Sequence, residues 1–118
     1  MSVTNYFLIM LAIALVESGG NDYAVGENGE IGRLQTKAIV VRDINRIYGT
    51  HYHHQDCVNY NVSLDIFNRY QNYYLRKLDK PFTLENMCLL WNGGPDLDGS
   101  KRYVKKVRKK YEELLKRT

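Results

Sequence analysis

Glu17 has the position in this sequence that most suggests chemistry. It directly follows an unbroken apolar run of 11 residues, Tyr6 to Val16. If the run is a buried helix, Glu17 lies at its C-terminal end, where the helix dipole disfavours a negative charge. Burial also disfavours the ionised carboxyl, so both effects raise its pKa from an ordinary value of about 4.3. Glu17 could then hold a proton near neutral pH, as a general acid must. The alternative is that Glu17 is simply the first exposed residue after a buried helix.

Further carboxylates lie close behind Glu17 in a glycine-interrupted segment. They are Asp22, Glu27 and Glu30, and glycines stand at positions 26, 29 and 32. A second carboxylate near an acid can activate a water molecule for hydrolysis. The alternative for each of them is a solvated surface acid.

Two blocks of the sequence resemble the lysozyme superfamily, specifically lytic transglycosylases and goose-type lysozymes. The first block is ALVESGGNDYAVGENGEIGRLQ, which matches the family's Glu-Ser pair, a following Asn and a G-x-x-Q motif. The second is WNGGP with a later tyrosine, which is similar to the family's Y-N-x-G helix end. The matching residues are Glu17-Ser18, Asn21, Gly32-Arg33-Leu34-Gln35, Trp91-Asn92-Gly93-Gly94 and Tyr103. Arg33 departs from the pattern, because this position is usually apolar; its side chain could point outward or bind a peptide-stem carboxylate.

The resemblance implies a lysozyme-like fold and a peptidoglycan-cleaving enzyme. Its implied roles are Glu17 as acid and then base, Ser18 in support of the local geometry, and Gln35 as a lining residue of the substrate cleft. Asn92 would close the site, and Tyr103 would reach toward Glu17. The structural alternatives are that Gln35 caps the next helix, Asn92 ends a helix and Tyr103 is a core residue.

The reaction type stays open at this point. Hydrolysis needs a second carboxylate, for which Glu30 or Glu27 is the candidate. A lytic transglycosylase needs none, because the sugar's own 6-hydroxyl attacks and leaves a 1,6-anhydro product. The acids of the segment slightly favour hydrolysis, so the expected enzyme is a lysozyme, with transglycosylation as the alternative. A non-catalytic glycan-binding module is a further alternative.

About five helices and one small β-hairpin are expected, which makes the class α+β but mostly α. The first helix should run from Val3 to Glu17, capped by Ser2 or Thr4, and end at Gly19-Gly20. The Asn28-Gly29 pair favours the hairpin. The remaining helices are expected over 37–48, from a Ser63 cap to about residue 78, after a Thr83 cap, and after a Ser100 cap.

Length and charge limit the other classes of function. The 118 residues suit a single domain over positions 1–118, and a monomer is expected. Nine of the 17 Lys and Arg residues fall in the last 18 positions, a basic tail that suits an anionic cell wall. Nucleic-acid binding is the rival interpretation of this tail, and we expect none, because its apolar residues keep a helical period. No stable membrane insertion is expected, since the apolar run is shorter than the roughly 20 residues that span a bilayer.

Neither a metal nor another cofactor is expected. His51, His53 and His54 lie close to Asp56 and Cys57, but their spacing is not that of a known zinc site. Cys57 and Cys88 could pair or remain free thiols. A bacteriolytic protein of this size suggests a phage endolysin, released from the host cytoplasm or carried in the virion, although the sequence contains no convincing signal for export.

Overall fold

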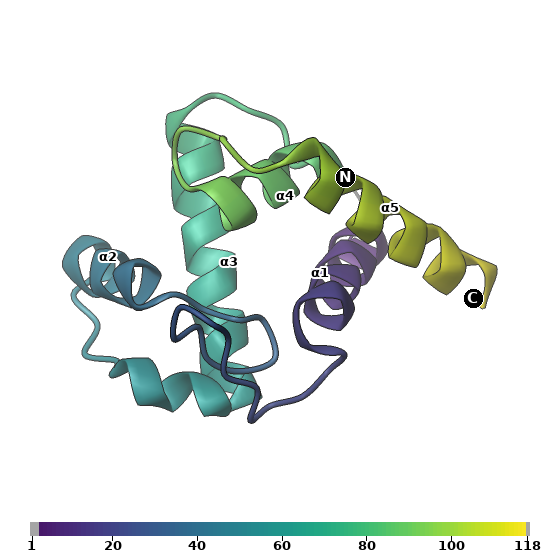
Figure 1. Cartoon of the computed structure of the whole chain (residues 1–118). Coiled ribbons are helices and arrows are strands. Elements are labelled where there is room, and N and C mark those ends of the chain that lie inside the picture. The colour runs from purple at the N-terminus through teal and green to yellow at the C-terminus, as the bar shows by residue number, and fades with distance from the viewer. Residues whose placement is uncertain (1–2, 118) are drawn as a thin grey trace. The chain divides into compact units, whose positions relative to one another are not determined.

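The structure is a computed structural model that describes residues 3–117. Within this range the regular structure consists of five α-helices and one short 3₁₀ helix. In chain order they are α1 (Val3–Ser18), α2 (Ala38–Tyr48), η1 (His54–Val58), α3 (Tyr60–Lys77), α4 (Leu84–Gly93) and α5 (Lys101–Lys116) (Figure 1). The five expected helices are confirmed. Within the described range no helix is long and apolar enough to cross a membrane.

The predicted β-hairpin is wrong, because residues 3–117 contain no β-strand and the class over this range is all-α. Two isolated antiparallel bridges, Val25 with Ile31 and Ile31 with Thr36, are all that forms there. The chain reverses direction twice in this stretch, at residues 26–30 and again at 32–35. Because the two reversals are so close together, the segments between them are too short to pair as β-strands.

The chain divides into two compact units. The first comprises Met1–Val16 together with Gln71–Thr118, and the second comprises Glu17–Tyr70. The expectation of a single domain over residues 1–118 stays a prediction. The two units are described separately below.

The first unit contains most of α1, the last part of α3, and α4 and α5. Ala12, Ile13 and Ala14 of α1 are fully buried, as an apolar helix of this kind requires. Helices α4 and α5 lie side by side (Figure 1). Both begin at the predicted caps: the Thr83 hydroxyl accepts a hydrogen bond from the Asn86 N–H at 3.1 Å, and the Ser100 hydroxyl accepts one from the Tyr103 N–H at 3.0 Å.

The second unit contains α2, η1 and the start of α3. The predicted cap of α3 is wrong: the helix begins at Tyr60, and the Asn59 side chain accepts hydrogen bonds from the backbone N–H groups of its first turn. Ser63 is instead fully buried, and its hydroxyl donates to the Cys57 carbonyl at 2.7 Å. Of the two expected caps of α1, Thr4 is wrong, because it falls within the helix, and Ser2 lies outside the described residues.

Candidate active site

Glu17 is the last residue but one of α1 and is half-buried. The helix ends at Ser18, because Gly19 and Gly20 adopt φ values of 67° and 86°, which close a helix. Glu17 therefore lies in the last turn of the helix, the end that carries negative partial charge. The position of Glu17 at the end of the helix is confirmed, and its role as a general acid stays a prediction.

The Ser18 side chain ties the end of α1 to the loop that follows. Its hydroxyl donates to the Arg33 carbonyl at 2.6 Å and accepts from the Gly20 and Asn21 N–H groups, both at 3.1 Å. One side chain thus satisfies two backbone donors beyond the helix and holds a residue 15 positions away. Ser18 brings the G-x-x-Q segment to the end of the helix that carries Glu17.

Gln35 closes the loop from its other end. Its side-chain amide donates to the carbonyl oxygens of Ala24 and Gly32, at 3.2 Å and 3.0 Å. Its backbone has a φ of 52°, an uncommon conformation for a residue other than glycine. Gln35 is half-buried, and both hydrogen bonds of its amide nitrogen go to backbone carbonyl oxygens of the loop. Its carbonyl oxygen Oε1 remains as the group that could accept a hydrogen bond from a ligand.

The two candidate bases differ in their surroundings. Glu30 is half-buried, and its Oε1 accepts a hydrogen bond from the Asn28 N–H at 2.8 Å, whereas Glu27 is exposed. Gly26 lies close to the side chains of Glu30 and Gln35. A Cβ atom at position 26 would come within 2.6 Å of the Oε1 atom of each. The loop therefore brings two oxygen acceptors from separate residues to one point, and a side chain at position 26 would displace both.

The Arg33 side chain pairs with Asp22. Its guanidinium forms two hydrogen bonds to the Asp22 carboxylate, at 2.8 Å and 3.2 Å, and lies 3.8 Å from the ring centroid of Tyr60. The hydrogen bond to Asp22 raises the pKa of Arg33. The bidentate pair engages Asp22, which leaves Glu27 and Glu30 as the loop acids without an ion pair in the described part of the chain.

Asn92 and Tyr103 belong to the first unit, whereas Glu17, Ser18 and Gln35 belong to the second. The Asn92 side-chain oxygen accepts a hydrogen bond from the Ser100 N–H at 2.9 Å. It therefore holds the turn between α4 and α5. Tyr103 is buried, with 8% of its surface exposed. The predicted roles of Asn92 and Tyr103 beside Glu17 stay predictions.

The histidine-rich segment has local structural uses. The His53 N–H donates to the Asp56 carboxylate at 2.8 Å, which caps η1, and the His54 ring nitrogen Nε2 lies 2.7 Å from the Thr36 carbonyl oxygen. No group of three or more potential metal ligands occurs within residues 3–117. Cys57 and Cys88 are both buried, and neither is part of a disulfide within the described residues. Burial raises the pKa of the Cys57 thiol to about 11, which makes it a poor nucleophile at neutral pH.

The structure contains a pocket that the sequence did not predict. A pocket of about 540 Å³, here called the cationic pocket, lies between α4 and α5 and is lined by Glu85, Lys101, Arg102, Val104, Lys105 and Arg108. The sequence predicted only that the basic tail suits an anionic cell wall. The signal that could have found the pocket is the spacing of Lys101, Lys105 and Arg108, which places all three on one side of a helix.

Comparisons of the chain with protein-family models, with curated proteins and with solved structures found no match. The assignment of a function therefore depends on the residues and their geometry.

Proposed function

We propose that the chain is a peptidoglycan glycosidase that cleaves the β-1,4 bond between N-acetylmuramic acid and N-acetylglucosamine, with Glu17 as the general acid. In this proposal the five helices adopt a lysozyme-like arrangement, and the protein acts at the bacterial cell wall. The observation that carries the proposal is the position of Glu17, a half-buried carboxyl one residue before the end of an apolar helix.

The surrounding loop supports this role for Glu17. Ser18 and Gln35 hold the loop by five hydrogen bonds in all, which keeps the segment from Gly32 to Gln35 at the end of α1. A preorganised loop beside an acid is what substrate positioning requires, because each mobile group would have to be ordered when the substrate binds.

The proposed reaction is hydrolysis. Glu17 donates its proton to the glycosidic oxygen while the bond from that oxygen to the sugar carbon C1 breaks. A water molecule attacks C1 and gives its proton to a second carboxylate. We assign this base to Glu30 ahead of Glu27, because Glu30 is half-buried and oriented by the Asn28 N–H, whereas Glu27 is exposed. An inverting enzyme holds its two carboxyl groups roughly 6.5–9.5 Å apart, which leaves room for the water.

Transglycosylation is the second candidate reaction, and one observation favours it. Two of the three loop carboxylates are engaged in local structure, since Asp22 pairs with Arg33 and Glu30 accepts from the Asn28 backbone. A lytic transglycosylase needs no second carboxylate, because the 6-hydroxyl of the substrate attacks C1. Its product carries a 1,6-anhydro end instead of a reducing end.

The first test replaces Glu17 with Gln, which keeps the size of the side chain and removes its proton. We expect Glu17→Gln to abolish release of fragments from purified peptidoglycan, while circular dichroism and the unfolding midpoint stay close to those of the wild type. The matched control is Glu112→Gln on the exposed face of α5, which makes the same replacement of a carboxyl by an amide and should keep full activity. An active Glu17→Gln variant would contradict the assignment of the acid. A wild type that binds peptidoglycan without releasing product would identify a glycan-binding module.

Mass spectrometry of the fragments distinguishes the two reactions. Reducing ends indicate hydrolysis and 1,6-anhydro ends indicate transglycosylation. If Glu30 is the base, Glu30→Gln should slow hydrolysis by about 10²- to 10⁴-fold. If the products are 1,6-anhydro sugars, the same variant should retain most of its activity.

A further inference from the structure

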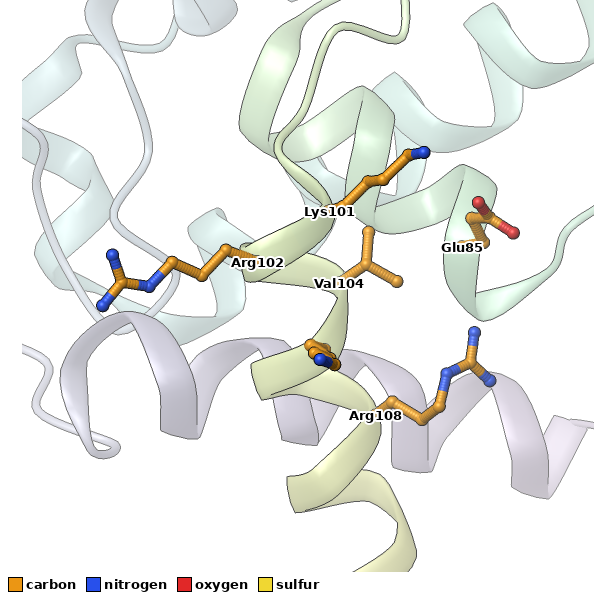
Figure 2. Close-up of a pocket in the computed structure, with 6 residues that line it drawn as sticks. Glu85, Lys101, Arg102, Val104 and Arg108 are labelled. Carbon is orange, nitrogen blue, oxygen red and sulfur yellow. The ribbon is translucent and has the colours of Figure 1, made fainter.

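The walls of the cationic pocket are one face of α5 and the first turn of α4. Lys101, Val104, Lys105 and Arg108 follow the spacing of a single face of α5, and Glu85 lies in the first turn of α4. In Figure 2 the side chains of Lys101 and Arg108 extend toward the side on which Glu85 lies, with Val104 between them. Val104 and the aliphatic stems of the basic residues give the pocket an apolar floor below charged ends.

The protein neutralises the positive charge of the pocket only in part. Four cations and one carboxylate line it, and the four cations are all exposed. None of the four forms an ion pair with another residue in the range 3–117. Lys110 on the same helix, in contrast, pairs with Glu113 at 3.1 Å. The pocket therefore has charge available for an anion from solution.

The end of the helix adds to this positive potential. Lys101 and Arg102 are the first two residues of α5, and its first turn contains no acidic residue. The N-terminal end of a helix carries positive partial charge, so cations there are unfavourable by a few tenths of a kcal/mol to about 1 kcal/mol each. An anion bound in the pocket would relieve this repulsion and gain from the lysine and arginine side chains at the same time.

We propose that the cationic pocket binds a phosphate group of a phosphodiester-linked polyol, such as a glycerol phosphate polymer. The cations would hold the phosphate, and the Glu85 carboxylate would accept a hydrogen bond from a neighbouring hydroxyl of the polyol. A nucleic acid fits less well, because the pocket contains no aromatic side chain on which a base could stack. Deoxyribose in a DNA strand also offers Glu85 no hydroxyl to bind. This binding site uses none of the residues assigned to peptidoglycan cleavage, so it stands or falls independently of that proposal.

The test measures binding of labelled poly(glycerol phosphate) and of a single-stranded oligodeoxynucleotide with the same number of phosphates, by fluorescence anisotropy. The pocket variant is Lys101→Gln with Lys105→Gln. The matched control is Lys106→Gln with Lys109→Gln, which removes the same charge from exposed positions of α5 outside the pocket. We expect the pocket variant to lose about tenfold in affinity for poly(glycerol phosphate) and the control less than about threefold. Affinity of the wild type should fall between about 50 mM and about 200 mM salt.

The Glu85→Gln variant tests whether Glu85 gives the pocket its preference for poly(glycerol phosphate) over the oligodeoxynucleotide. Removal of this negative charge should strengthen binding of both polyanions, but binding of the oligodeoxynucleotide more, so that the preference for poly(glycerol phosphate) falls. Equal losses in the pocket and control variants would overturn the proposal in favour of a diffuse charge effect. An oligodeoxynucleotide bound as tightly as poly(glycerol phosphate), or an unchanged preference in Glu85→Gln, would overturn the polyol assignment. Thermal unfolding of each variant verifies that it is folded.

Discussion

At the scale of single residues, the loop before α2 depends on close backbone contacts that a side chain would prevent. Gly32 has a φ of 89°, and a Cβ atom there would overlap the backbone carbonyl oxygen of Cys57. Gly29 has a similar φ of 82°, but a Cβ atom there would meet nothing within 4 Å. The two glycines share the left-handed conformation and differ only in the space around them.

Alanine at each of these positions separates conformational strain from steric overlap. We expect Gly29→Ala to lower the free energy of unfolding by about 1–2 kcal/mol, the cost of the left-handed conformation. Gly32→Ala should cost about 3 kcal/mol or more, because the Cys57 backbone must also move. Urea denaturation followed by circular dichroism measures both. Equal losses would mean that the contact between Gly32 and Cys57 does not constrain the loop.

At the scale of elements, the first turns of α4 and α5 depend on one hydroxyl each. Thr83→Ala and Ser100→Ala should each lower the free energy of unfolding by about 1 kcal/mol, because each leaves a backbone N–H without its cap. Thr83→Ser and Ser100→Thr keep the hydroxyl and serve as controls that should stay close to the wild type. Urea unfolding midpoints provide the comparison. An alanine variant as stable as its control would show that the cap does not stabilise that helix.

The Ser100 cap also bears on the cationic pocket. It determines where α5 begins, and therefore which residues occupy its positive end. Asn92 supports the same residue from α4, since its side chain accepts the Ser100 N–H. The sequence motif that suggested an active-site role for Asn92 thus has a structural use at this junction.

At the scale of the whole molecule, the buried thiol of Cys57 and the half-buried phenol of Tyr6 link stability to alkaline pH. Burial raises the pKa of Cys57 from an ordinary value of 9.0 to about 11, and that of Tyr6 from 10.0 to about 12. Each group holds its proton more tightly in the folded state than in the unfolded state. The resulting stabilisation is complete below the unfolded pKa and is lost as the pH rises through the folded pKa.

We therefore expect the free energy of unfolding to decline from about pH 9 upward, first through Cys57 and then, above about pH 10, through Tyr6. Cys57→Ala should flatten the slope between about pH 9 and 11, and Tyr6→Phe should flatten it between about pH 10 and 12. Urea unfolding at a series of pH values measures these slopes. A slope that is the same in the variants and the wild type would exclude these two groups as its cause.

The sequence by itself determined where most helices begin and end. The Thr83 and Ser100 caps and the Gly19-Gly20 stop depend on residues within a few positions of each helix end, so local chemistry was sufficient to predict them. It also identified Glu17 as an acid at the end of an apolar helix, because the apolar run and the acid are contiguous in the chain.

Only the tertiary structure decided what depends on residues that are distant in the chain. The sequence predicted Ser63 as a helix cap. Its hydroxyl instead donates a hydrogen bond to the Cys57 carbonyl oxygen, and Asn59 caps α3. The Asp22–Arg33 pair and the cationic pocket between α4 and α5 likewise required the fold. A hydrogen bond, an ion pair or a pocket wall depends on which side chains meet in space, and the period of a sequence records only which side of its own helix a residue occupies.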